Sequence, residues 1–418
     1  MKVVVAGQGY VGLPLAVRAA ERGHSVVGYD VDQHRTKQLA AGESFVQDVT
    51  SVQLRAVLDS GAYRATADAD ALAGGYDIAV ITVPTPLRHG APDLSFVESC
   101  ARTLGEHLRQ GATVVLESTS YPGTTRELLV PILEEASGLR AGDFLAGFSP
   151  ERITPGSPRF SFAETPKLVS GIDAKSLDAI RGFYDTVFDI TVPVSRPEVA
   201  EMAKLLENTF RLVNISMINE LAMLAHSLGV NVWEAIEAAN TKPFGFTRFT
   251  PGPGVGGHCL PVDPVFLSWK AEQETGVPFQ FVELAAEVNH RMPEYVVQRL
   301  MEGLDKRRIP ISGARILLLG LTYKINATDL RESPSLRVAD LLRDLGAEVR
   351  GADPNIPEGD RAELAMLRVD ASPEEIAAAD AVVLLMDHAL FDFEAIQEHA
   401  PYVLDCRNRL SGANVEVL

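Results

Sequence analysis

The stretch VVVAGQGYVGLPLAVRAAERG, residues 3–23, decides the fold of the N-terminal part of the chain. Its apolar start predicts a buried strand, its first three glycines predict a tight turn, and its remainder follows the pattern of a helix. Gly7 permits the turn, Gly9 lets a pyrophosphate approach the backbone, and Gly12 lets the helix pack close to the strand. The helix N-terminus then faces the phosphates, so we predict a dinucleotide site that includes Tyr10 and Val11.

Asp30 ends the next predicted strand, close to the spacing of about 20 residues at which a carboxylate binds the ribose hydroxyls. The alternative is a structural glycine turn beside a surface Asp, and the strand and helix around the loop make it the weaker one. Because a carboxylate repels a 2′-phosphate, we predict NAD rather than NADP as the cofactor. Arg35 keeps NADP open, since an arginine near this position can bind a phosphate, and it joins the cofactor-binding candidates.

Short apolar runs alternate with helical patterns through the first third of the chain, which predicts a parallel sheet covered by helices. The predicted strands span residues 3–6, 25–29, 78–83, 113–117, 144–148 and 167–170. Polar motifs follow three of them: TVPTP with Thr85, EST with Thr119, and SPER with Glu151 and Arg152. Each motif alone is compatible with ordinary loop chemistry. Ligands bind beyond the carboxyl ends of such strands, so we expect the three motifs to point into one crevice.

The pattern changes after residue 196, where residues 198 to about 228 read as one long helix that stops at Gly229. A second helical region covers residues 279–304, with a kink expected at Pro293. From residue 314 the strand–helix alternation returns. The predicted fold class is therefore α/β, with two Rossmann-like domains (1–196 and 305–418) joined by a long-helix central domain (197–304). Long helices of this kind hold two subunits together or form an internal bundle, and the sequence favours neither.

Composition limits the functional classes. The 418 residues carry a formal net charge of −18, which disfavours nucleic acid and anionic membranes as partners of the whole chain. No apolar run reaches the roughly 18 residues of a membrane helix, and the N-terminus lacks the apolar region of a signal peptide. The three cysteines form neither a zinc motif nor a disulfide framework, so we expect no metal and a reducing, cytoplasmic location.

The segment PGPGVGGHCLPVDP, residues 251–264, places Cys259 in a loop rich in glycine and proline. Such a loop allows close approach of a ligand, and this favours a nucleophilic thiol over a buried inert one. Cys100, within a helical pattern, and Cys406, at a strand end, are expected to be inert. Lys204 and Asn208 lie four positions apart on the long helix and so share a face.

Periodicity alone favours structural rather than catalytic roles for the polar residues of that helix. Lys204 would be a solvated charge and Asn208 a polar cap. Glu207 and Arg211, also four positions apart, would form no more than a surface ion pair.

Together these residues resemble the UDP-glucose/GDP-mannose dehydrogenase family. The resemblance spans nearly the whole chain and rests on the N-terminal glycine loop, TVPTP, STSYPGTT, SPER, the helix with Lys204 and Asn208, GGHCLPVDP, and Lys324 through DLRESPS. Within the family, TKPFGF, the 251–264 segment and ERITPG look most like the branch that oxidises UDP-N-acetylglucosamine at C6. The resemblance implies an NAD-dependent four-electron oxidation of a C6 alcohol to a carboxylate, in a homodimer or a larger homo-oligomer.

The resemblance also implies roles for single residues. Cys259 would capture the C6 aldehyde as a thiohemiacetal, and a second hydride transfer would give a thioester that water hydrolyses. Lys204 and Asn208 would stabilise oxyanions, and Asp263 would position water or relay protons. Thr119 and Glu151 would lie between nicotinamide and sugar and help activate water.

Further residues would bind ligands. Lys324 would contact the nucleotide sugar together with Arg152 and Gly256, and Arg331 would reach the cofactor. One departure concerns the sugar: UDP-glucose enzymes of the family commonly carry a second Glu where this chain has Pro155.

Three alternatives remain open. The substrate can be UDP-glucose. The enzyme can be a two-electron NAD-dependent oxidoreductase of the hydroxyacid type, with a structural Cys259 and one NADH per substrate. The chain can also be an NAD-sensing protein without turnover, although the joint presence of Lys204, Asn208, Cys259 and Asp263 disfavours that.

Overall fold

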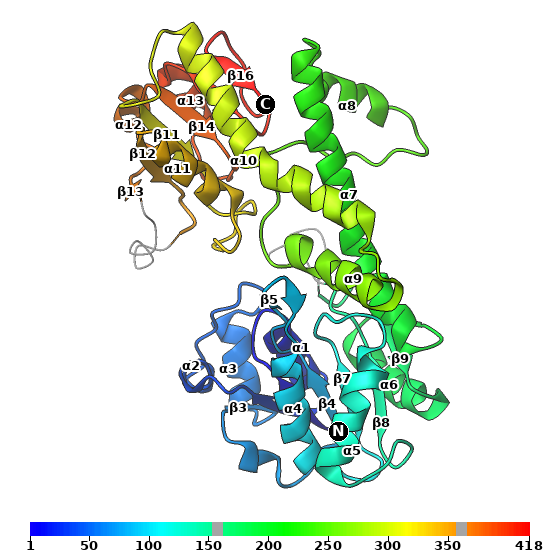
Figure 1. Cartoon of the computed structure of the whole chain (residues 1–418). Helices are drawn as coiled ribbons and strands as arrows, with labels where there is room; N and C mark the ends of the chain where they lie inside the picture. The colour runs from blue at the N-terminus through cyan, green and yellow to red at the C-terminus, as the bar shows by residue number, and fades with distance from the viewer. Residues whose placement is uncertain (153–161, 357–365) are drawn as a thin grey trace. The chain divides into compact units, whose positions relative to one another are not determined.

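The computed structural model describes residues 1–152, 162–356 and 366–418. Contacts divide the chain into two units (Figure 1). The N-terminal unit comprises Met1–Glu207 and Val265–Val277, and the C-terminal unit comprises Asn208–Pro264 and Pro278–Leu418.

The N-terminal unit is built on an eight-stranded sheet with the order β10-β9-β8-β7-β4-β1-β2-β3. All neighbouring strands pair in parallel except β8 and β9, which are antiparallel. The strands are β1 (Lys2–Ala6), β2 (Ser25–Tyr29), β3 (Tyr63–Thr66), β4 (Ile78–Ile81), β7 (Thr113–Leu116), β8 (Leu145–Phe148), β9 (Lys167–Gly171) and β10 (Thr191–Pro193). A small hairpin is formed by β5 (Leu87–Arg88) and β6 (Ala91–Pro92).

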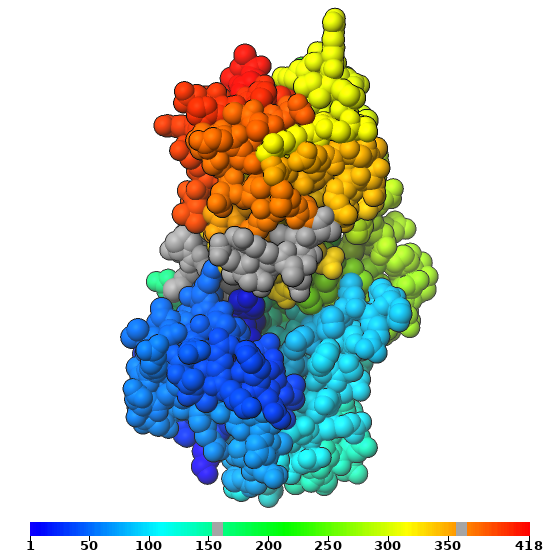
Figure 2. Space-filling model, turned by 90° about the vertical axis from the view of Figure 1, so that its left-hand side faces the viewer, coloured from blue at the N-terminus to red at the C-terminus, as the bar shows by residue number. Residues whose placement is uncertain are grey.

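Helices cover both faces of this sheet, because its central strands are buried on both sides. They are α1 (Gly12–Glu21), α2 (Gln33–Ala40), α3 (Ser51–Asp59), α4 (Ser95–Glu106), α5 (Val130–Ser137) and α6 (Ala174–Val187), with short helical turns η1 (Ala69–Leu72) and η2 (Thr125–Leu129). Both α2 and α3 lie on the outer surface of the unit (blue in Figure 2), and most of their residues are exposed or half-buried.

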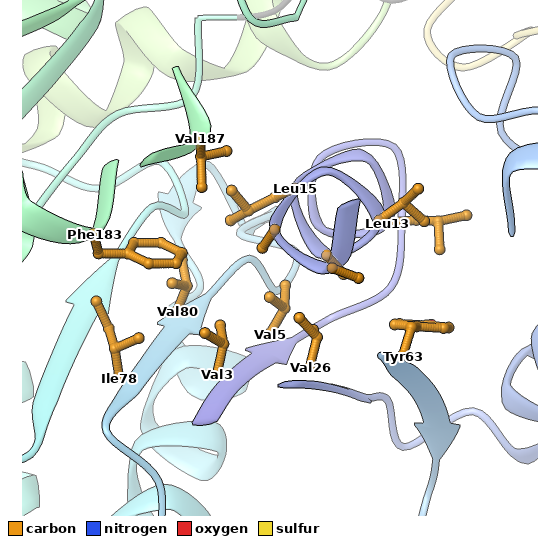
Figure 3. Packing of buried hydrophobic residues seen from close by; sticks show 14 of the residues in the cluster. Val3, Val5, Leu13, Leu15, Val26, Tyr63, Ile78, Val80, Phe183 and Val187 are labelled. Carbon is orange, nitrogen blue, oxygen red and sulfur yellow. The ribbon is translucent and has the colours of Figure 1, made fainter. Parts of the chain in front are cut away.

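The core of the unit lies between the sheet and its helices. Figure 3 shows Val3 and Val5 of β1 pointing toward Leu15 of α1, with Phe183 of α6 beside Val80 of β4. All five side chains are buried. This packing holds α1 against β1. The loop between them therefore lies at the edge of the sheet where β2 and β4 also end.

The C-terminal unit contains a six-stranded parallel sheet with the order β13-β12-β11-β14-β15-β16. Its strands are β11 (Arg315–Leu319), β12 (Glu348–Ala352), β13 (Leu367–Arg368), β14 (Ala381–Leu384), β15 (Val403–Asp405) and β16 (Val415–Val417). Helices α11 (Pro334–Asp344), α12 (Pro373–Ala377) and α13 (Phe393–His399) connect them, and α10 (Gln280–Lys306) packs against α11. The predicted α/β fold class, with a second Rossmann-like sheet, is confirmed.

Long helices supply the middle of the chain. They are α7 (Pro197–Ser227), α8 (Val232–Asn240), α9 (Cys259–Thr275) and α10. The predicted stop of α7 is confirmed, since Gly229 adopts a φ of 68°, which a residue with a side chain rarely adopts. Pro293 lies inside α10, which continues through it. Among the described residues, no helix combines the length and the apolar character needed to cross a bilayer.

The predicted strands match the observed ones within about two residues, and the differences have local causes. The predicted strand 78–83 ends at Ile81, because the Thr82 hydroxyl donates to the carbonyl oxygens of Ala6 (3.0 Å) and Gly7 (2.8 Å) in the neighbouring loop. Strands β3 and β10 were not predicted. Both lie at sheet edges, where a strand needs less apolar sequence than in the sheet centre.

Candidate active site

The glycine loop after β1 has the geometry that its sequence demands. Gly7 has a φ of 93°, and a Cβ on it would lie 2.5 Å from the Thr82 carbonyl oxygen. A Cβ on Gly12 would lie 1.8 Å from the Gly7 carbonyl oxygen, so only glycine lets α1 begin this close to the loop. A Cβ on Gly9 would meet nothing within 4 Å, which leaves the backbone accessible to a ligand. Val11 is half-buried and the Tyr10 side chain is exposed.

The Asp30 carboxylate is buried at the end of β2, beside the same loop. Its Oδ2 accepts hydrogen bonds from the Gln8 N–H (2.7 Å) and from Arg35 Nη1 (2.8 Å), while Oδ1 accepts from the Asp32 N–H (3.0 Å). The carboxylate therefore ties the glycine loop to α2, whose N-cap is Asp32. Arg35 is anchored by Asp30 and lies over the Phe45 ring.

The three polar motifs that follow strands lie close together. The Ser118 hydroxyl donates to the Val83 carbonyl (2.8 Å), which joins the EST motif to TVPTP. The buried Lys167 ammonium contacts Glu117 (2.7 Å) and donates to the Pro150 carbonyl (3.1 Å), which joins EST to SPER. Thr85 is buried and Thr119 is half-buried in this group.

Lys204 of α7 contacts the SPER motif. Its Nζ donates to the Glu151 carbonyl oxygen (2.7 Å) and to Glu151 Oε2 (3.0 Å), and its exposed fraction is only 6%. The interpretation of Lys204 as a solvated charge is therefore wrong, because the helix faces the loop after β8 at this position. The predicted pair of Glu207 with Arg211 is also replaced: Glu207 contacts Arg152 (2.7 Å).

Asn208 and Asp263 form a second buried pair, in the C-terminal unit. The Asn208 Nδ2 donates to Asp263 Oδ2 over 2.6 Å, and both side chains are at least 94% buried, so Asn208 is not a polar cap. Lys204 and Asn208 are one turn apart on α7, as their spacing predicted. The boundary between the units falls between Glu207 and Asn208.

Cys259 is exposed and begins helix α9, whereas the sequence predicted that it lies in a loop that continues to residue 264. The helix accommodates Pro261 because N–H groups in the first turn have no helical partner. Asp263 follows Cys259 by one turn. The partial positive charge of a helix N-terminus favours a thiolate at this position.

The glycines before Cys259 pack against the loop after β11. A Cβ on Gly256 would lie 2.4 Å from the Glu332 carbonyl oxygen, and one on Gly257 would lie 2.4 Å from the Tyr323 ring. The Gly257 N–H donates to the Arg331 carbonyl (3.0 Å). The loop of Lys324 and Arg331 therefore lies directly beside Gly256 and Gly257, and the Arg331 guanidinium contacts Asp329 (2.6 Å).

The other two cysteines are buried, as predicted. Burial, with a further contribution from Asp30, raises the pKa of Cys100 to about 12. Burial, with Asp405 next, raises the pKa of Cys406 to about 12. Neither thiol ionises near neutral pH, so Cys259 is the only reactive candidate.

Two buried charges were missed by the sequence analysis. Glu201, one turn before Lys204, accepts from the N–H groups of Gly123 (2.7 Å) and Thr125 (2.9 Å), and so holds the loop that follows Thr119. Lys167 lies beneath Pro150. The spacing of Glu201 and Lys204 on one face of α7 was a usable signal, whereas nothing local distinguishes Lys167 from a surface lysine at a strand start.

Pro155 lies outside the described residues, so the ERITPG motif has no structural account. In the N-terminal unit the structure brings together the glycine loop with Asp30, and the polar motifs with Lys204. In the C-terminal unit it brings together Asn208 with Asp263, and the loops of Cys259, Lys324 and Arg331.

Comparison with known proteins gives matches along nearly the whole chain. Residues 1–188 match the NAD binding domain of the UDP-glucose/GDP-mannose dehydrogenase family, residues 198–291 its central domain, and residues 317–412 its UDP binding domain. The chain is 37% identical to the UDP-N-acetyl-D-mannosamine dehydrogenase of Pyrococcus horikoshii, over 98% of this chain and 96% of that protein. It is 36% identical to the UDP-N-acetyl-D-glucosamine 6-dehydrogenase of Pseudomonas aeruginosa, over 94% and 91%.

The fold agrees with a solved structure of such an enzyme. The UDP-D-ManNAc dehydrogenase of Pyrococcus horikoshii superposes with a TM-score of 0.90 and 36% identity, covering 100% of this chain and 99% of the other. The N-terminal sheet therefore belongs to the NAD-binding domain, and the C-terminal sheet belongs to the UDP-binding domain. This chain therefore belongs to the UDP-glucose/GDP-mannose dehydrogenase family and is an NAD-dependent nucleotide-sugar dehydrogenase that oxidises a UDP-sugar to a uronate.

Proposed function

We propose that this enzyme oxidises the C6 alcohol of a UDP-linked 2-acetamido-hexose, UDP-N-acetylglucosamine or its C2 epimer UDP-N-acetylmannosamine, through a thioester on Cys259. The observation that carries the covalent route is the exposed Cys259 thiol at the first residue of α9. Asp263, which is hydrogen-bonded to Asn208, follows one turn later on the same helix. A thiol at a helix N-terminus is activated as a nucleophile, and Cys100 and Cys406 are buried.

Gly7, Gly9, Gly12 and Asp30 would hold NAD, which would accept the hydride of each oxidation. Because one NAD accepts one hydride, NADH would leave and a second NAD would bind between the two oxidations. In the first, the C6 alcohol loses a hydride to NAD and its hydroxyl proton to solvent water and becomes an aldehyde, while the Lys204 ammonium stabilises the alkoxide that develops. The Cys259 sulfur then adds to the aldehyde carbon and forms a thiohemiacetal. Loss of a second hydride and a proton leaves a thioester on Cys259.

Hydrolysis completes the cycle. Water adds to the thioester carbon, the C–S bond breaks, and the carboxylate leaves as the thiol is restored. Lys204 and Asn208 stabilise the oxyanion of the tetrahedral intermediate, and Asp263 accepts the proton of the attacking water or orients Asn208 for its task. Glu151, which Lys204 contacts, and Thr119 help to activate this water.

Further residues are assigned to binding. We assign Tyr10, Val11, Arg35, Thr85 and Arg331 to the cofactor, in addition to the residues above. Arg152, Gly256 and Lys324 are assigned to the nucleotide sugar. The names of the two relatives support an acetamido sugar, and so does Pro155 in ERITPG.

A substrate panel with purified enzyme and NAD tests both parts of the proposal. We expect the two UDP-acetamido-hexoses to give the highest kcat/KM, with two NADH formed per sugar and no free aldehyde. A preference for UDP-glucose would reject the sugar and keep the chemistry. One NADH per sugar, with an aldehyde or ketone as product, would reject the thioester route and favour a two-electron oxidoreductase.

We also propose that the enzyme is a homodimer held through α7. Four exposed apolar side chains recur at helical spacing on α7, namely Phe210, Met217, Leu221 and Leu224, and the exposed Leu228 follows just after the helix ends. They form one stripe, and a stripe of this length on a water-facing helix marks a protein interface. Light scattering should give twice the chain mass for the wild type, and Leu224→Glu should shift it toward the monomer. A monomeric wild type would contradict this proposal.

A further inference from the structure

A buried histidine and a buried aspartate lie at the carboxyl edge of the C-terminal sheet. Asp353 follows β12 and His388 follows β14, and the two strands flank β11. The His388 side chain has no exposed surface, and its Nε2 lies 3.0 Å from Asp353 Oδ2. Thr322, also fully buried, places its hydroxyl 3.1 Å from His388 Nε2 and 3.2 Å from Asp353 Oδ2.

The hydrogen bonds define the state of the imidazole. The Asn326 N–H donates to His388 Nδ1 over 2.9 Å, so Nδ1 must carry a lone pair. The ring proton is then on Nε2 and points to the Asp353 carboxylate. His388 is therefore a neutral ring that accepts on one side and donates on the other.

Asp353 is fixed just as firmly. Its Oδ2 also accepts from the N–H groups of Leu321 (2.8 Å) and Thr322 (3.0 Å). Burial by itself raises the pKa of Asp353, but the contact with His388 and the hydrogen bonds from the Thr322 and Asn355 N–H groups outweigh it, and the pKa is lowered. A carboxylate with this many internal donors is a structural anchor and not a ligand for the substrate.

The anchored segment is the one that carries Lys324. Asn326 adopts a φ of 55°, a conformation that asparagine tolerates better than most residues. Its N–H is held by His388, and its Oδ1 accepts from the Ala389 N–H (2.9 Å). The Thr322 hydroxyl also reaches the Lys324 carbonyl (3.3 Å). Hydrogen bonds thus hold residues 322–326 on both sides of Lys324.

We propose that His388 is a positioning residue for UDP-sugar binding: as a neutral acceptor for the Asn326 N–H, it holds residues 322–326 in the conformation that presents Lys324 to the nucleotide sugar. Asp353 and Thr322 hold the ring in that orientation. The inference rests on the assignment of Lys324 to the substrate in the proposed function. It adds a group that touches neither substrate nor cofactor and acts through the backbone.

The test compares two substitutions that separate the two hydrogen bonds of the ring. In His388→Asn, the side-chain oxygen occupies the place of Nδ1 and still accepts from Asn326. In His388→Gln, the amide reaches the place of Nε2 and still donates to Asp353, but the acceptor is lost. His388→Ala removes both, and His24→Asn, at a buried histidine of the N-terminal unit bonded to Thr186, is the matched control.

The readouts are the Kd of UDP by calorimetry and the KM values for UDP-sugar and NAD. We expect His388→Ala and His388→Gln to raise the Kd of UDP and the KM of UDP-sugar about tenfold, as for a buried donor left without an acceptor. His388→Asn should stay within about threefold of wild type. The KM of NAD should not change in any variant, and His24→Asn should match wild type throughout.

Two results would overturn the proposal. One is wild-type affinity for UDP in His388→Ala. The other is equal loss in His388→Asn and His388→Gln, which would show that the ring acts only by filling space. If the His388 variants fail to fold, Thr322→Val provides the decision, since valine keeps the shape of the side chain and removes the hydroxyl that contacts His388 Nε2 and the Lys324 carbonyl.

Thr322→Val should raise the Kd of UDP twofold to fivefold, and an unchanged value would equally overturn the proposal. The proposed function fails in a different way, namely when wild-type enzyme forms no NADH with any UDP-sugar. Even then, the UDP affinities of the variants decide whether His388 positions the loop.

Discussion

The two sheets of this enzyme share one arrangement at the carboxyl ends of β1 and β11, and they differ in the segments that follow. In both, a glycine with positive φ ends the first central strand: Gly7 (93°) after β1 and Gly320 (85°) after β11. In both, an aspartate after the next strand caps the loop, because Asp30 accepts from the Gln8 N–H (2.7 Å) and Asp353 accepts from the Leu321 N–H (2.8 Å). The backbone also agrees, since the glycine N–H donates to the carbonyl of Tyr29 (2.8 Å) or Ala352 (2.9 Å).

The two sheets differ in the segment that comes after this glycine. After Gly7 the chain enters α1 at Gly12, and a Cβ on Gly9 would meet nothing within 4 Å, so the backbone before the helix is open. After Gly320 the chain forms a long loop before α11 begins at Pro334, and the loop offers Lys324 and Arg331 instead. The partner of the aspartate changes accordingly, from the half-exposed Arg35 to the fully buried His388.

The comparison teaches how one scaffold serves two ligands. A short loop binds a pyrophosphate through backbone N–H groups and needs only glycines. A long loop can present side chains to a second nucleotide, but it needs an internal anchor to hold its shape. His388 and Asp353 are that anchor, which is why the second sheet lacks the glycine motif and still binds a nucleotide.

The largest expected effect tests whether the N-terminal sheet binds the cofactor independently of Cys259. Cys259→Ala should reduce uronate formation at least about 10³-fold, because no thiohemiacetal can form. The Kd of NAD should stay within twofold of wild type. Cys100→Ala and Cys406→Ala are the controls and should retain most activity. Uronate formation by Cys259→Ala near the wild-type rate would remove the covalent mechanism.

The next largest effect tests whether Gly7 and Gly320 have equivalent roles in their two sheets. A Cβ would lie 2.5 Å from the Thr82 carbonyl oxygen at Gly7 and 2.5 Å from Met386 Cβ at Gly320. The strained backbone costs about 1–3 kcal/mol at each site, so Gly7→Ala should weaken NAD and Gly320→Ala should weaken UDP, each about tenfold or more. Calorimetry with both ligands measures this, and each variant should leave the other ligand within twofold.

Matched controls separate strain from ligand binding. Gly23 (φ 87°) and Gly313 (φ 84°) share the conformation, but a Cβ on either would meet nothing within 4 Å. Alanine at these positions should lower stability and leave both affinities unchanged. If Gly320→Ala binds UDP with wild-type affinity, Gly7 and Gly320 do not have equivalent roles in their two sheets.

A smaller effect concerns the aspartate of the N-terminal sheet. Asp30→Ser removes the charge that repels a 2′-phosphate and frees Arg35 from its 2.8 Å contact. The ratio of kcat/KM for NAD over NADP should fall about tenfold. Steady-state kinetics with the two cofactors decide this, and a wild-type enzyme that uses both equally would refute the role of Asp30.

The sequence predicted the fold because both sheets are built from short apolar runs with recognisable turns. The glycine loop and Asp30 were predictable because their roles are local. The environment of Lys204 was not, since its burial depends on Glu151, which is 53 residues away. Periodicity along α7 reports only the helix itself, and it therefore favoured a solvated lysine.

The Cys259 segment shows a second limit. Its glycines and prolines predicted a loop, yet α9 begins at Cys259: the first helical turn tolerates Pro261, and the helix continues through Pro264. His388 and Asp353 left no sequence signal, since a lone histidine and a lone aspartate after strands are common. Their function follows only from the contacts with Thr322 and Asn326.

The smallest expected effect uses two buried carboxylates whose pKa values shift in opposite directions. Burial, only partly offset by hydrogen bonds from Thr125 and Gly123, raises the pKa of Glu201 above 4.5. Its contribution to the stability of the N-terminal unit is full below pH 4.5 and is lost as pH rises through the raised value. The lowered pKa of Asp353, below 3.8, has the opposite sign: its contribution is present above pH 4 and is lost as pH falls further.

The two tryptophans report the units separately, because Trp269 lies in the N-terminal unit and Trp233 in the C-terminal unit. Urea unfolding should be followed by fluorescence between pH 3 and 7, in the Trp233→Phe background for Glu201→Gln and in the Trp269→Phe background for Asp353→Asn. Each variant is less stable than its parent, since the new amide faces N–H donors, but it lacks the titrating proton. The slope of unfolding free energy with pH should therefore flatten by at most about 1.4 kcal/mol per pH unit, above pH 4.5 for Glu201→Gln and below pH 4 for Asp353→Asn. Equal slopes in parent and variant would show that the two carboxylates titrate alike in the folded and unfolded chain, and the contrast between the two units would then rest on their loops alone.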